Sequence, residues 1–264
     1  MKFVPHASFR AATTRLRIGA LALIAVGGFT ASAAISARAA TPAGVPVLMY
    51  HRVDAVVPND AVGRDLTVEP AAFDAQLKWL AAHHIRTITA AALADELARG
   101  EHPQHVVVLT FDDGYDDAAT TALPILVRDH AVGTFYVSSG FVGTPRHLTW
   151  RQMREMKRAG MEVACHGTNH LDLSTLDRKG QEAEASGCTK RFAHYLGGVA
   201  PTTYAYPAGQ YDATTFAVMH ELGIRAAFTE HPGDVTSFAQ PLALPRLRVR
   251  HDDTVAQFGS VATP

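Results

Sequence analysis

Short apolar runs alternate with segments of helical character along most of this chain, and this alternation constrains the fold more than any other feature. Strand and helix repeating at this spacing predict a parallel α/β sheet or barrel. In such folds, functional side chains gather at the carboxyl ends of the strands. The predicted strands are residues 45–50, 85–88, 105–110, 134–138, 163–165, 203–206, 226–229 and 244–250, and the predicted helices start at 69 and cover 90–99, 118–128, 149–159, 178–196 and 212–222. Residues 54–68, which are polar and rich in Asp and Pro/Gly, are expected to form a loop.

Two adjacent carboxylates end the third apolar run. Asp112 and Asp113 follow the apolar residues at 108–111, and Gly114 turns the chain directly after them. Burying ionised carboxylates costs free energy. A pair at the end of a buried strand therefore indicates catalysis or a bound cation.

Two imidazoles follow the apolar run at 161–165. His166 and His170 are four positions apart, and the turn-forming residues between them suit a loop after a strand. Two histidines and one aspartate can hold a catalytic divalent metal ion and leave a coordination position for water. The other aspartate is then free to act as a base, which predicts a metal-dependent hydrolase.

The charge is distributed unevenly along the 264 residues. Residues 1–40 hold five basic and no acidic residues, which leaves 19 basic against 25 acidic residues in the rest of the chain. A mildly acidic body lacks the basic surface by which proteins bind nucleic acid, so no nucleic-acid partner is expected.

Residues 1–40 have the organisation of an export signal. A basic region ends at Arg17, an uncharged stretch covers 18–37, and the sequence Ala-Arg-Ala at 37–39 fits a signal-peptidase site. The alternative is an uncleaved anchor, the one case in which we expect membrane contact. Both alternatives place the catalytic domain, residues 41–264, in the periplasm or outside the cell.

The chain has two cysteines, Cys165 and Cys188. They could pair in an oxidising compartment, but two cysteines alone do not make a disulfide framework. Cys165 is interpreted as a small buried residue rather than a metal ligand.

The segments at 110–114 and 162–170 resemble the first two motifs of the polysaccharide deacetylase family, and the resemblance covers residues 45–258. It implies a distorted (β/α) barrel and an acetylated polysaccharide as substrate. It also implies that Asp112 is the general base and that Asp113, His166 and His170 hold one divalent metal ion. Mixed nitrogen and oxygen ligands suit zinc, and cobalt, nickel or iron would also fit.

The third family motif has the form Arg-x-Pro-Tyr/Phe-Gly, and residues 205–209 match it without the arginine and the aromatic residue. The backbone N–H of Ala208 can still serve as an oxyanion donor. The missing arginine normally orients the base. Arg246 or Arg248 could replace it, and the alternative is that both are surface cations.

The family also uses a histidine as general acid near the final strand. His251 is the nearest candidate and His231 a weaker one, with an exposed loop histidine as the alternative interpretation of His251.

Four further residues are expected to contact the substrate. They are His51, Trp150, Tyr206 and Pro207. For Trp150, a position in the core or at a helix end is the alternative.

Residues 45–51 and 244–249 are most similar to the branch that acts on β-1,6-linked poly-N-acetylglucosamine. The resemblance therefore implies metal-dependent hydrolysis of N-acetyl groups on that exopolysaccharide. Chitooligosaccharide, peptidoglycan and acetylxylan are alternative substrates. A non-catalytic glycan-binding protein is the alternative from another class, and the intact Asp112 disfavours it because binding needs no base.

Overall fold

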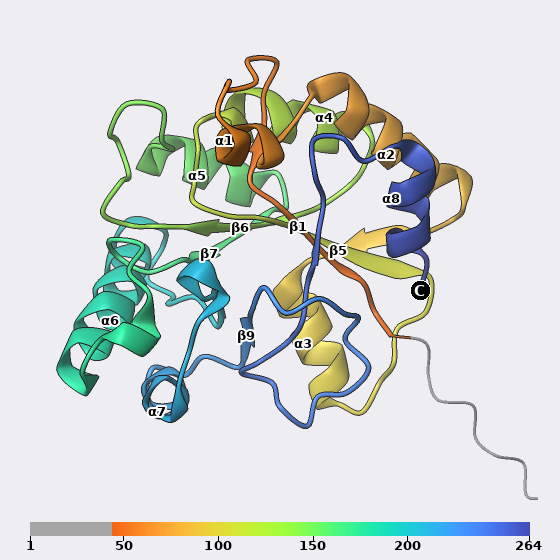
Figure 1. The fold of residues 1–264 in the computed structure, drawn as a ribbon. Coiled ribbons are helices and arrows are strands. Elements are labelled where there is room, and N and C mark those ends of the chain that lie inside the picture. Colours follow the sequence, from red (N-terminus) through yellow and green to blue (C-terminus); the bar gives the residue numbers. More distant parts are fainter. Residues whose placement is uncertain (1–43) are drawn as a thin grey trace, which may run out of the picture. The chain divides into compact units, whose positions relative to one another are not determined.

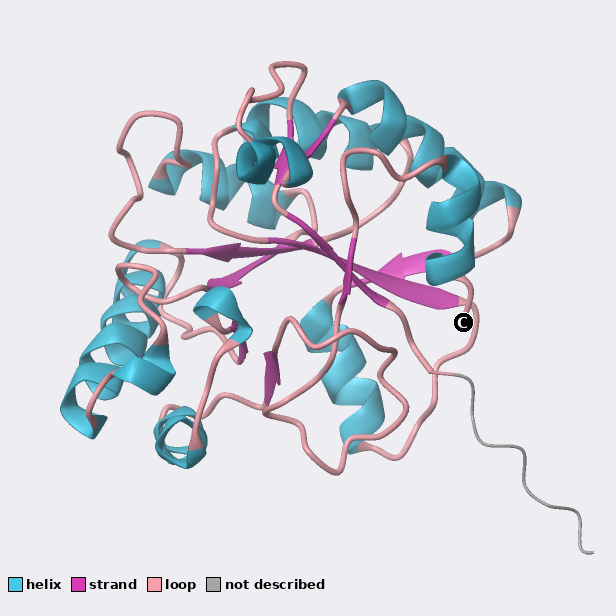
Figure 2. Cartoon of the chain, viewed as in Figure 1, coloured by secondary structure: helices cyan, strands magenta, loops and turns pink. Residues whose placement is uncertain are grey.

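The computed structural model describes residues 44–264, and a curled parallel sheet forms its centre (Figures 1 and 2). Seven strands follow one another in the order β10-β1-β5-β6-β7-β8-β9, and β4 pairs with the first half of β5. Every pairing in this sheet is parallel. The strands are β1 (Val47–Tyr50), β4 (Arg86–Ile88), β5 (Val106–Phe111), β6 (Thr134–Val137), β7 (Glu162–Cys165), β8 (Thr203–Ala205), β9 (Ala226–Phe228) and β10 (Leu247–Arg248).

Helices connect successive strands and lie on both sides of them (Figure 1). Several begin at a side-chain cap that the sequence supplies; for example, Thr149 and Gln152 form a capping box at the start of α5. The helices are α1 (Ala61–Asp65), α2 (Pro70–Ala82), α3 (Ala90–Ala98), α4 (Leu123–Arg128), α5 (Trp150–Arg158), α6 (Arg178–Tyr195), α7 (Ala213–Glu221) and α8 (Val255–Ala262).

The strand period of two divides β5 between two hydrophobic clusters. Leu109 and Phe111 belong to one cluster, in which Phe111 stacks on Phe135 at 4.6 Å between ring centroids. Val106 and Val108 belong to the other, together with residues of α3. Because side chains alternate along a strand, Asp112 lies on the same side of the sheet as Val108.

The predicted strand at 244–250 is split into two pieces. Leu244 forms a parallel bridge with Phe228 of β9, whereas Leu247 and Arg248 pair with β1. Pro245 lies between the two pieces and has no N–H for a strand ladder. This segment therefore passes from one end of the sheet to the other and closes it, as the predicted distorted (β/α) barrel requires.

Two other predicted segments differ in detail. The predicted loop at 54–68 contains α1, whose first turn is capped by Asp60, and a short strand β3 (Thr67–Val68) that pairs with β2 (Arg52–Val53). The predicted helix at 118–128 is divided into a π-helical turn, Ala118–Ala122, and α4, with Pro124 at the start of α4.

Cys165 and Cys188 form a disulfide that joins the end of β7 to α6. The structure therefore settles the pairing that the sequence left open. In residues 44–264, no helix is long and apolar enough to cross a membrane. The predicted signal peptide or anchor at 1–40 lies outside the described residues.

Candidate active site

The two aspartates follow β5 and point to different surroundings. The N–H of Asp112 continues the ladder to the carbonyl of Tyr50 at 3.0 Å, and Asp113 then adopts a positive φ of 72°. Gly114 is required in this turn, because a Cβ there would lie 2.4 Å from Cγ1 of Val137. The turn separates the two carboxylates, so that each can take a different role.

The two predicted histidine ligands converge on Asp113. Nε2 of His166 lies 3.5 Å and Nε2 of His170 lies 3.2 Å from Oδ1 of Asp113. Nδ1 of His166 is 2.8 Å from the carbonyl oxygen of Ala205, so Nδ1–H donates there and leaves Nε2 free to bind metal. One donor atom from each of the three residues lies within 4.8 Å of the others.

These donors fit a divalent metal ion. Oδ1 of Asp113 is buried and has no hydrogen-bond partner, which would be costly for a carboxylate without a cation. Burial raises the pKa of Asp113, but His166 and His170 outweigh it and hold this pKa well below the usual value. An ionised carboxylate and two imidazoles are a ligand set that zinc and similar metals accept.

The loop that carries His170 is held by Glu184, which the sequence analysis did not identify. This side chain is 3% exposed and accepts hydrogen bonds from the N–H groups of Asn169, at 2.5 Å, and Leu171, at 3.3 Å. Its second oxygen accepts from Nδ2 of Asn169 at 3.0 Å. Glu184 precedes Cys188 by one helical turn, so the same face of α6 is bonded to this loop by a carboxylate and to the end of β7 by the disulfide.

Arg246 is the residue that pairs with Asp112. Its guanidinium donates to both carboxylate oxygens, at 2.8 and 2.7 Å, and both side chains are at most 1% exposed. Further donors reach Oγ1 of Thr110 and the carbonyl of Thr229. Burial raises the pKa of Asp112, but the charge of Arg246 opposes it, and the pKa lies below the usual value. Arg248 instead pairs with Glu230.

His51 follows β1, and because Tyr50 of β1 pairs with Phe111 of β5, His51 and Asp112 lie at the ends of neighbouring strands. It is 8% exposed. Burial lowers its pKa, and the negative charges of Asp112 and Asp113 act in the opposite direction. The structure therefore brings an imidazole with little exposure to the predicted reaction centre.

The third-motif segment forms a tight turn after β8. Ala208 has a positive φ of 55° and is solvent-exposed, while the turn is closed by the N–H of Gly209, which donates to the carbonyl of Tyr206. Pro207 is buried in this turn. The side chain of Tyr206 is fully buried and its hydroxyl donates to the carbonyl of Leu242, so it supports the turn and offers no surface to a substrate.

An open hollow of about 250 Å³ is lined by two of the three donor residues, Asp113 and His170. Tyr115 and His147 line one part of it and stack with 5.5 Å between ring centroids. Phe141 lines it as well, on the loop after β6. These aromatic residues were not identified from the sequence, although Tyr115 comes directly after the turn at Asp112–Gly114 and Phe141 lies four residues after the end of β6.

Two predicted site residues lie elsewhere. Trp150 stacks on Tyr195 at 4.5 Å and packs edge-on against Phe192, outside the hollow that holds His170. Nδ1 of His251 lies 2.9 Å from the carbonyl oxygen of Thr67. Within residues 44–264, no hydrogen bond or ion pair joins His251 to Asp112 or Asp113.

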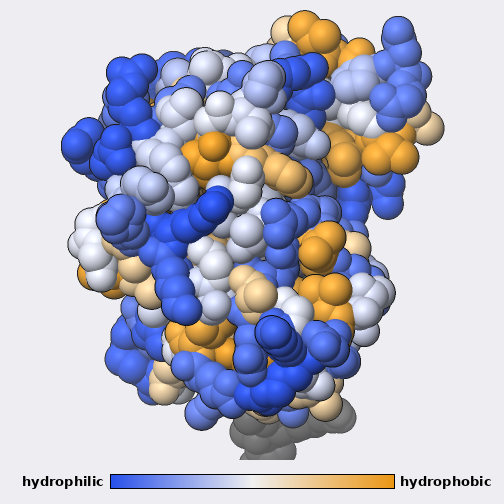
Figure 3. Space-filling model, turned by 90° about the vertical axis from the view of Figure 1, so that its left-hand side faces the viewer, coloured by the Kyte–Doolittle hydropathy of each residue, from blue (hydrophilic) through white to orange (hydrophobic). Residues whose placement is uncertain are grey.

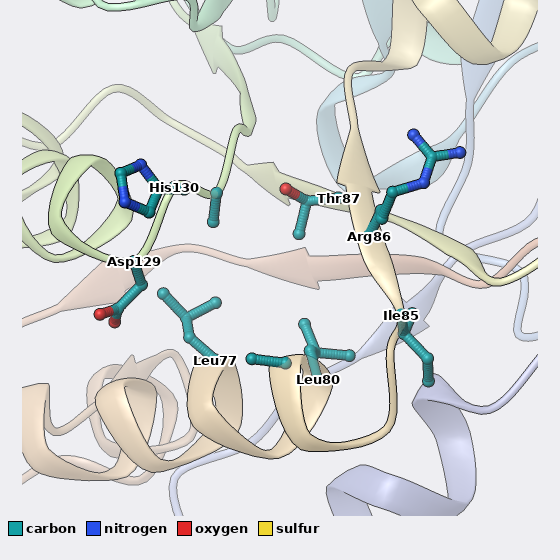
Figure 4. A pocket seen from close by; sticks show the side chains of 9 residues that line it. Leu77, Leu80, Ile85, Arg86, Thr87, Asp129 and His130 are labelled. Atoms are coloured by element: carbon teal, nitrogen blue, oxygen red, sulfur yellow. The ribbon is translucent and has the colours of Figure 1, made fainter.

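A separate hollow of about 340 Å³ lies at the opposite ends of the strands (Figure 4). Leu77 and Leu80 of α2 line it together with Arg86, the first residue of β4, and His130. Since the carboxyl ends of parallel strands carry the functional groups in such folds, this hollow is not the candidate active site.

The fold and the site together define a metal-dependent hydrolase built on a (β/α) barrel, and comparisons with known proteins identify its family. The family model for polysaccharide deacetylase matches residues 99–227. YxkH of Bacillus subtilis, a polysaccharide deacetylase by name, is 30% identical over 220 residues, which are 83% of this chain and 76% of YxkH. The poly-beta-1,6-N-acetyl-D-glucosamine N-deacetylase of Staphylococcus epidermidis is 26% identical over 227 residues, with 78% of each chain covered.

Solved structures give the same result. The deacetylase PplD of Streptococcus pyogenes, in complex with acetate, has a TM-score of 0.79 and 30% identity, with coverage of 85% of this chain and 100% of PplD. IcaB from Ammonifex degensii has a TM-score of 0.72 and 25% identity, with coverage of 84% and 97%. This chain belongs to the polysaccharide deacetylase family, whose members are metal-dependent hydrolases that act on N-acetyl groups.

Proposed function

We propose that this enzyme removes N-acetyl groups from β-1,6-linked poly-N-acetylglucosamine, with Asp112 as general base. The observation that carries the assignment is the buried Asp112–Arg246 pair, with two bonds of 2.8 and 2.7 Å, beside the three convergent donors. A glycan-binding protein would have no use for an ionised carboxylate buried at this position. The geometry therefore favours an enzyme over the non-catalytic alternative.

In this proposal each residue moves or holds a proton or a charge. Asp113, His166 and His170 bind one divalent metal ion, which supplies carbonyl polarisation and a more acidic water when bound. Asp112 takes the proton from the attacking water, and Arg246 keeps the carboxylate ionised and correctly turned. The backbone N–H of Ala208 donates to the acetyl oxygen as negative charge develops on it.

The leaving amine needs a proton, and two histidines are candidates. His251 is the candidate from the family pattern, but His51 is the one that lies at the strand end next to Asp112. A general acid must come within hydrogen-bond reach of the atom that it protonates. The position of His51 therefore favours it for this step, although from the sequence His51 was expected to contact the substrate or to orient the site.

The substrate and the metal rest on the relatives and on the donor set. The Staphylococcus epidermidis relative acts on poly-β-1,6-N-acetylglucosamine by its name. PplD was solved in complex with acetate, the product expected from the reaction proposed here. We propose zinc as the ion, since one carboxylate and two imidazoles suit it; cobalt, nickel and iron are the alternatives.

We also propose that the enzyme is exported. Residues 1–40 have the organisation of a signal peptide, and the Cys165–Cys188 disulfide suits an oxidising compartment outside the cytoplasm. Sequencing the amino terminus of the protein from its native host tests this, because export with cleavage predicts a new terminus near residue 40.

Acetate release from β-1,6-linked N-acetylglucosamine oligomers tests the proposed function. The enzyme is assayed after metal removal and again after zinc is restored, beside chitooligosaccharide, peptidoglycan and acetylxylan. Zinc-dependent release that favours the β-1,6 oligomer supports the proposal. Release from another polymer alone would keep the mechanism and reject this substrate, and binding without release from any polymer would support the glycan-binding alternative.

A further inference from the structure

Besides the hollow at Asp113 and His170, a second hollow, of about 450 Å³, lies next to the candidate active site. It is bounded by the last turns of α6 and by the loop between β6 and α5. This side of the molecule, over α5 and α6, faces the viewer in Figure 3, where hydrophilic surface surrounds a paler central region. Its lining includes Ser139, Trp150, Lys190, Arg191, His194 and Tyr195.

The two hollows are separated by a single loop. Phe141 lines the hollow at the metal ligands, and the next residue, Val142, lines the second hollow. The same loop is bonded to the metal-binding loop, since the N–H of Gly140 donates to the carbonyl of Thr168 at 2.7 Å. A polymer with one sugar at the metal ligands can therefore reach the second hollow by crossing this loop.

The lining combines aromatic faces with hydrogen-bond donors. Trp150 and Tyr195 form a stacked pair, with 4.5 Å between ring centroids, and Tyr195 is 44% exposed. The hydroxyl of Ser139 is buried and has no hydrogen-bond partner. Exposed aromatic rings with a few polar groups are the usual composition of a site for a small organic ligand such as a sugar.

The charge of this hollow is positive and uncompensated. Lys190 and Arg191 line it, and no carboxylate does. Among residues 44–264, no ion pair engages either of these two side chains. A positive patch is unexpected in a domain with more acidic than basic residues. A ligand of this hollow should therefore be one that positive charge does not repel.

We propose that the second hollow is a sugar subsite that accepts an N-acetylated unit of the polysaccharide and disfavours a deacetylated one. The proposal rests on the proposed function. An acetamide is neutral, and its carbonyl accepts hydrogen bonds from the ammonium and guanidinium groups present. Deacetylation replaces the acetamide with an amine, which is repelled by the same cations once it is protonated. The enzyme would thus prefer chain segments that still carry acetyl groups on both sides of the loop.

Binding to the Asp112→Asn variant with zinc tests the proposal, because this variant should not consume the ligand. The probes are an acetylated β-1,6-linked glucosamine oligomer and the same oligomer fully deacetylated, measured by calorimetry at mildly acidic pH. We expect the acetylated oligomer to bind about fivefold more tightly. Adding Lys190→Glu should bring this ratio to about one or below, whereas Lys179→Glu, at the other exposed end of α6, should leave it unchanged.

A second variant tests whether the exposed ring of Tyr195 binds the sugar. Tyr195→Ala removes the exposed ring and should weaken binding of the acetylated oligomer about tenfold without changing the charge. The proposal is overturned if Lys190→Glu leaves the ratio as it was, or if Tyr195→Ala binds as tightly as the parent. Acetate release by the wild-type enzyme is measured on the same acetylated oligomer. Release with an unchanged ratio rejects the subsite alone, and no release rejects the proposed substrate.

Discussion

Replacing Arg246 with methionine isolates the contribution of the buried ion pair. Methionine keeps a long side chain in the barrel but removes the charge and all the donors that reach Asp112, Thr110 and Thr229. Removing one partner of a buried ion pair leaves an uncompensated charge, which costs about 3 to 5 kcal/mol. We expect a loss of this size in the free energy of unfolding at neutral pH.

The pKa of Asp112 determines how the loss depends on pH. In the wild-type enzyme burial raises this pKa, but Arg246 outweighs it, and the result lies below the usual value. The ionised carboxylate therefore contributes stability above the unfolded pKa of about 3.9, and this contribution is lost as the pH falls through the folded pKa. Without Arg246, the largest charge that opposes burial is gone and only His166 and His51 still act against it, so the pKa rises. The variant should then be destabilised less at mildly acidic pH, where Asp112 is protonated, than at neutral pH.

Catalysis should change in the same direction. A protonated Asp112 cannot act as a base, so kcat/KM should fall about 10²–10⁴-fold near neutral pH, and its acidic limb should move to higher pH. The kcat/KM of Arg246→Lys should lie between those of the wild-type enzyme and Arg246→Met, since lysine keeps the charge but not the two parallel bonds. Arg250→Met removes an exposed cation that pairs with Asp65 and serves as the control.

The assays are the pH dependence of acetate release and urea unfolding at two pH values. An Arg246→Met enzyme with wild-type activity and an unmoved acidic limb would refute the base assignment for Asp112.

Three further predictions concern the metal, the general acid and the disulfide. Asp113→Ala should lose both bound zinc and activity, whereas Asp112→Asn should lose activity but keep zinc; equal metal content by elemental analysis would contradict the assignment. His51→Gln should lower kcat more than His251→Gln, because of these two histidines only His51 lies at the strand end next to Asp112, and the reverse order would favour His251 as the acid. Removing the disulfide with Cys188→Ala should lower the free energy of unfolding by about 3 to 4 kcal/mol, since it closes a loop with a sequence separation of 23; an unchanged urea midpoint would show that the bond contributes little.

The four residues at the centre of the site could be predicted because each follows the end of a strand. Asp112 and Asp113 come after β5, and His166 and His170 come after β7, two strands away in the sheet. In a parallel sheet the carboxyl ends of the strands meet at one edge. The alternation of strands and helices in the sequence was therefore enough to predict that these residues lie close together.

The choice between Arg246 and Arg248 could not be made from the sequence. The two residues are two positions apart, so in a regular strand both would face the same side. The segment instead crosses from β9 to β1 around Pro245, and this crossing turns Arg246 inward while Arg248 meets Glu230. Irregular backbone of this kind leaves no periodic pattern in a sequence.

The aromatic lining of the hollow and the contacts that hold the loop carrying His170 could not be predicted for a different reason. Tyr115 and His147 are 32 positions apart and meet through an isolated bridge between two loops. Glu184 lies within a helix rich in charged residues, where one more glutamate is expected to face solvent. Both features depend on which loops and helices lie side by side in the folded barrel. This arrangement cannot be predicted from a local sequence pattern.

Glu184→Gln should weaken zinc binding although Glu184 is not expected to touch the metal. Glutamine can offer one acceptor oxygen where the carboxylate offers two, so either the backbone N–H groups of Asn169 and Leu171 or the side-chain amide of Asn169 would meet an NH₂ group. Loss of such support for a ligand typically lowers metal affinity about 10–100-fold. Competition with a chelator measures this directly, and Glu182→Gln, which removes a partner of Arg178 on the same helix, is the matched control.

Unfolding of the metal-free proteins separates this effect from a general loss of stability. If metal-free Glu184→Gln is only slightly less stable than the wild type while its zinc affinity falls at least tenfold, the carboxylate acts by holding the His170 loop in the binding conformation. Equal zinc affinity in Glu184→Gln and Glu182→Gln would mean that the loop keeps this conformation without Glu184. The disulfide at Cys188, one turn further along α6, and the hydrogen bond from the Thr168 hydroxyl to the backbone carbonyl of residue 184 would then be enough to hold this helix against the loop.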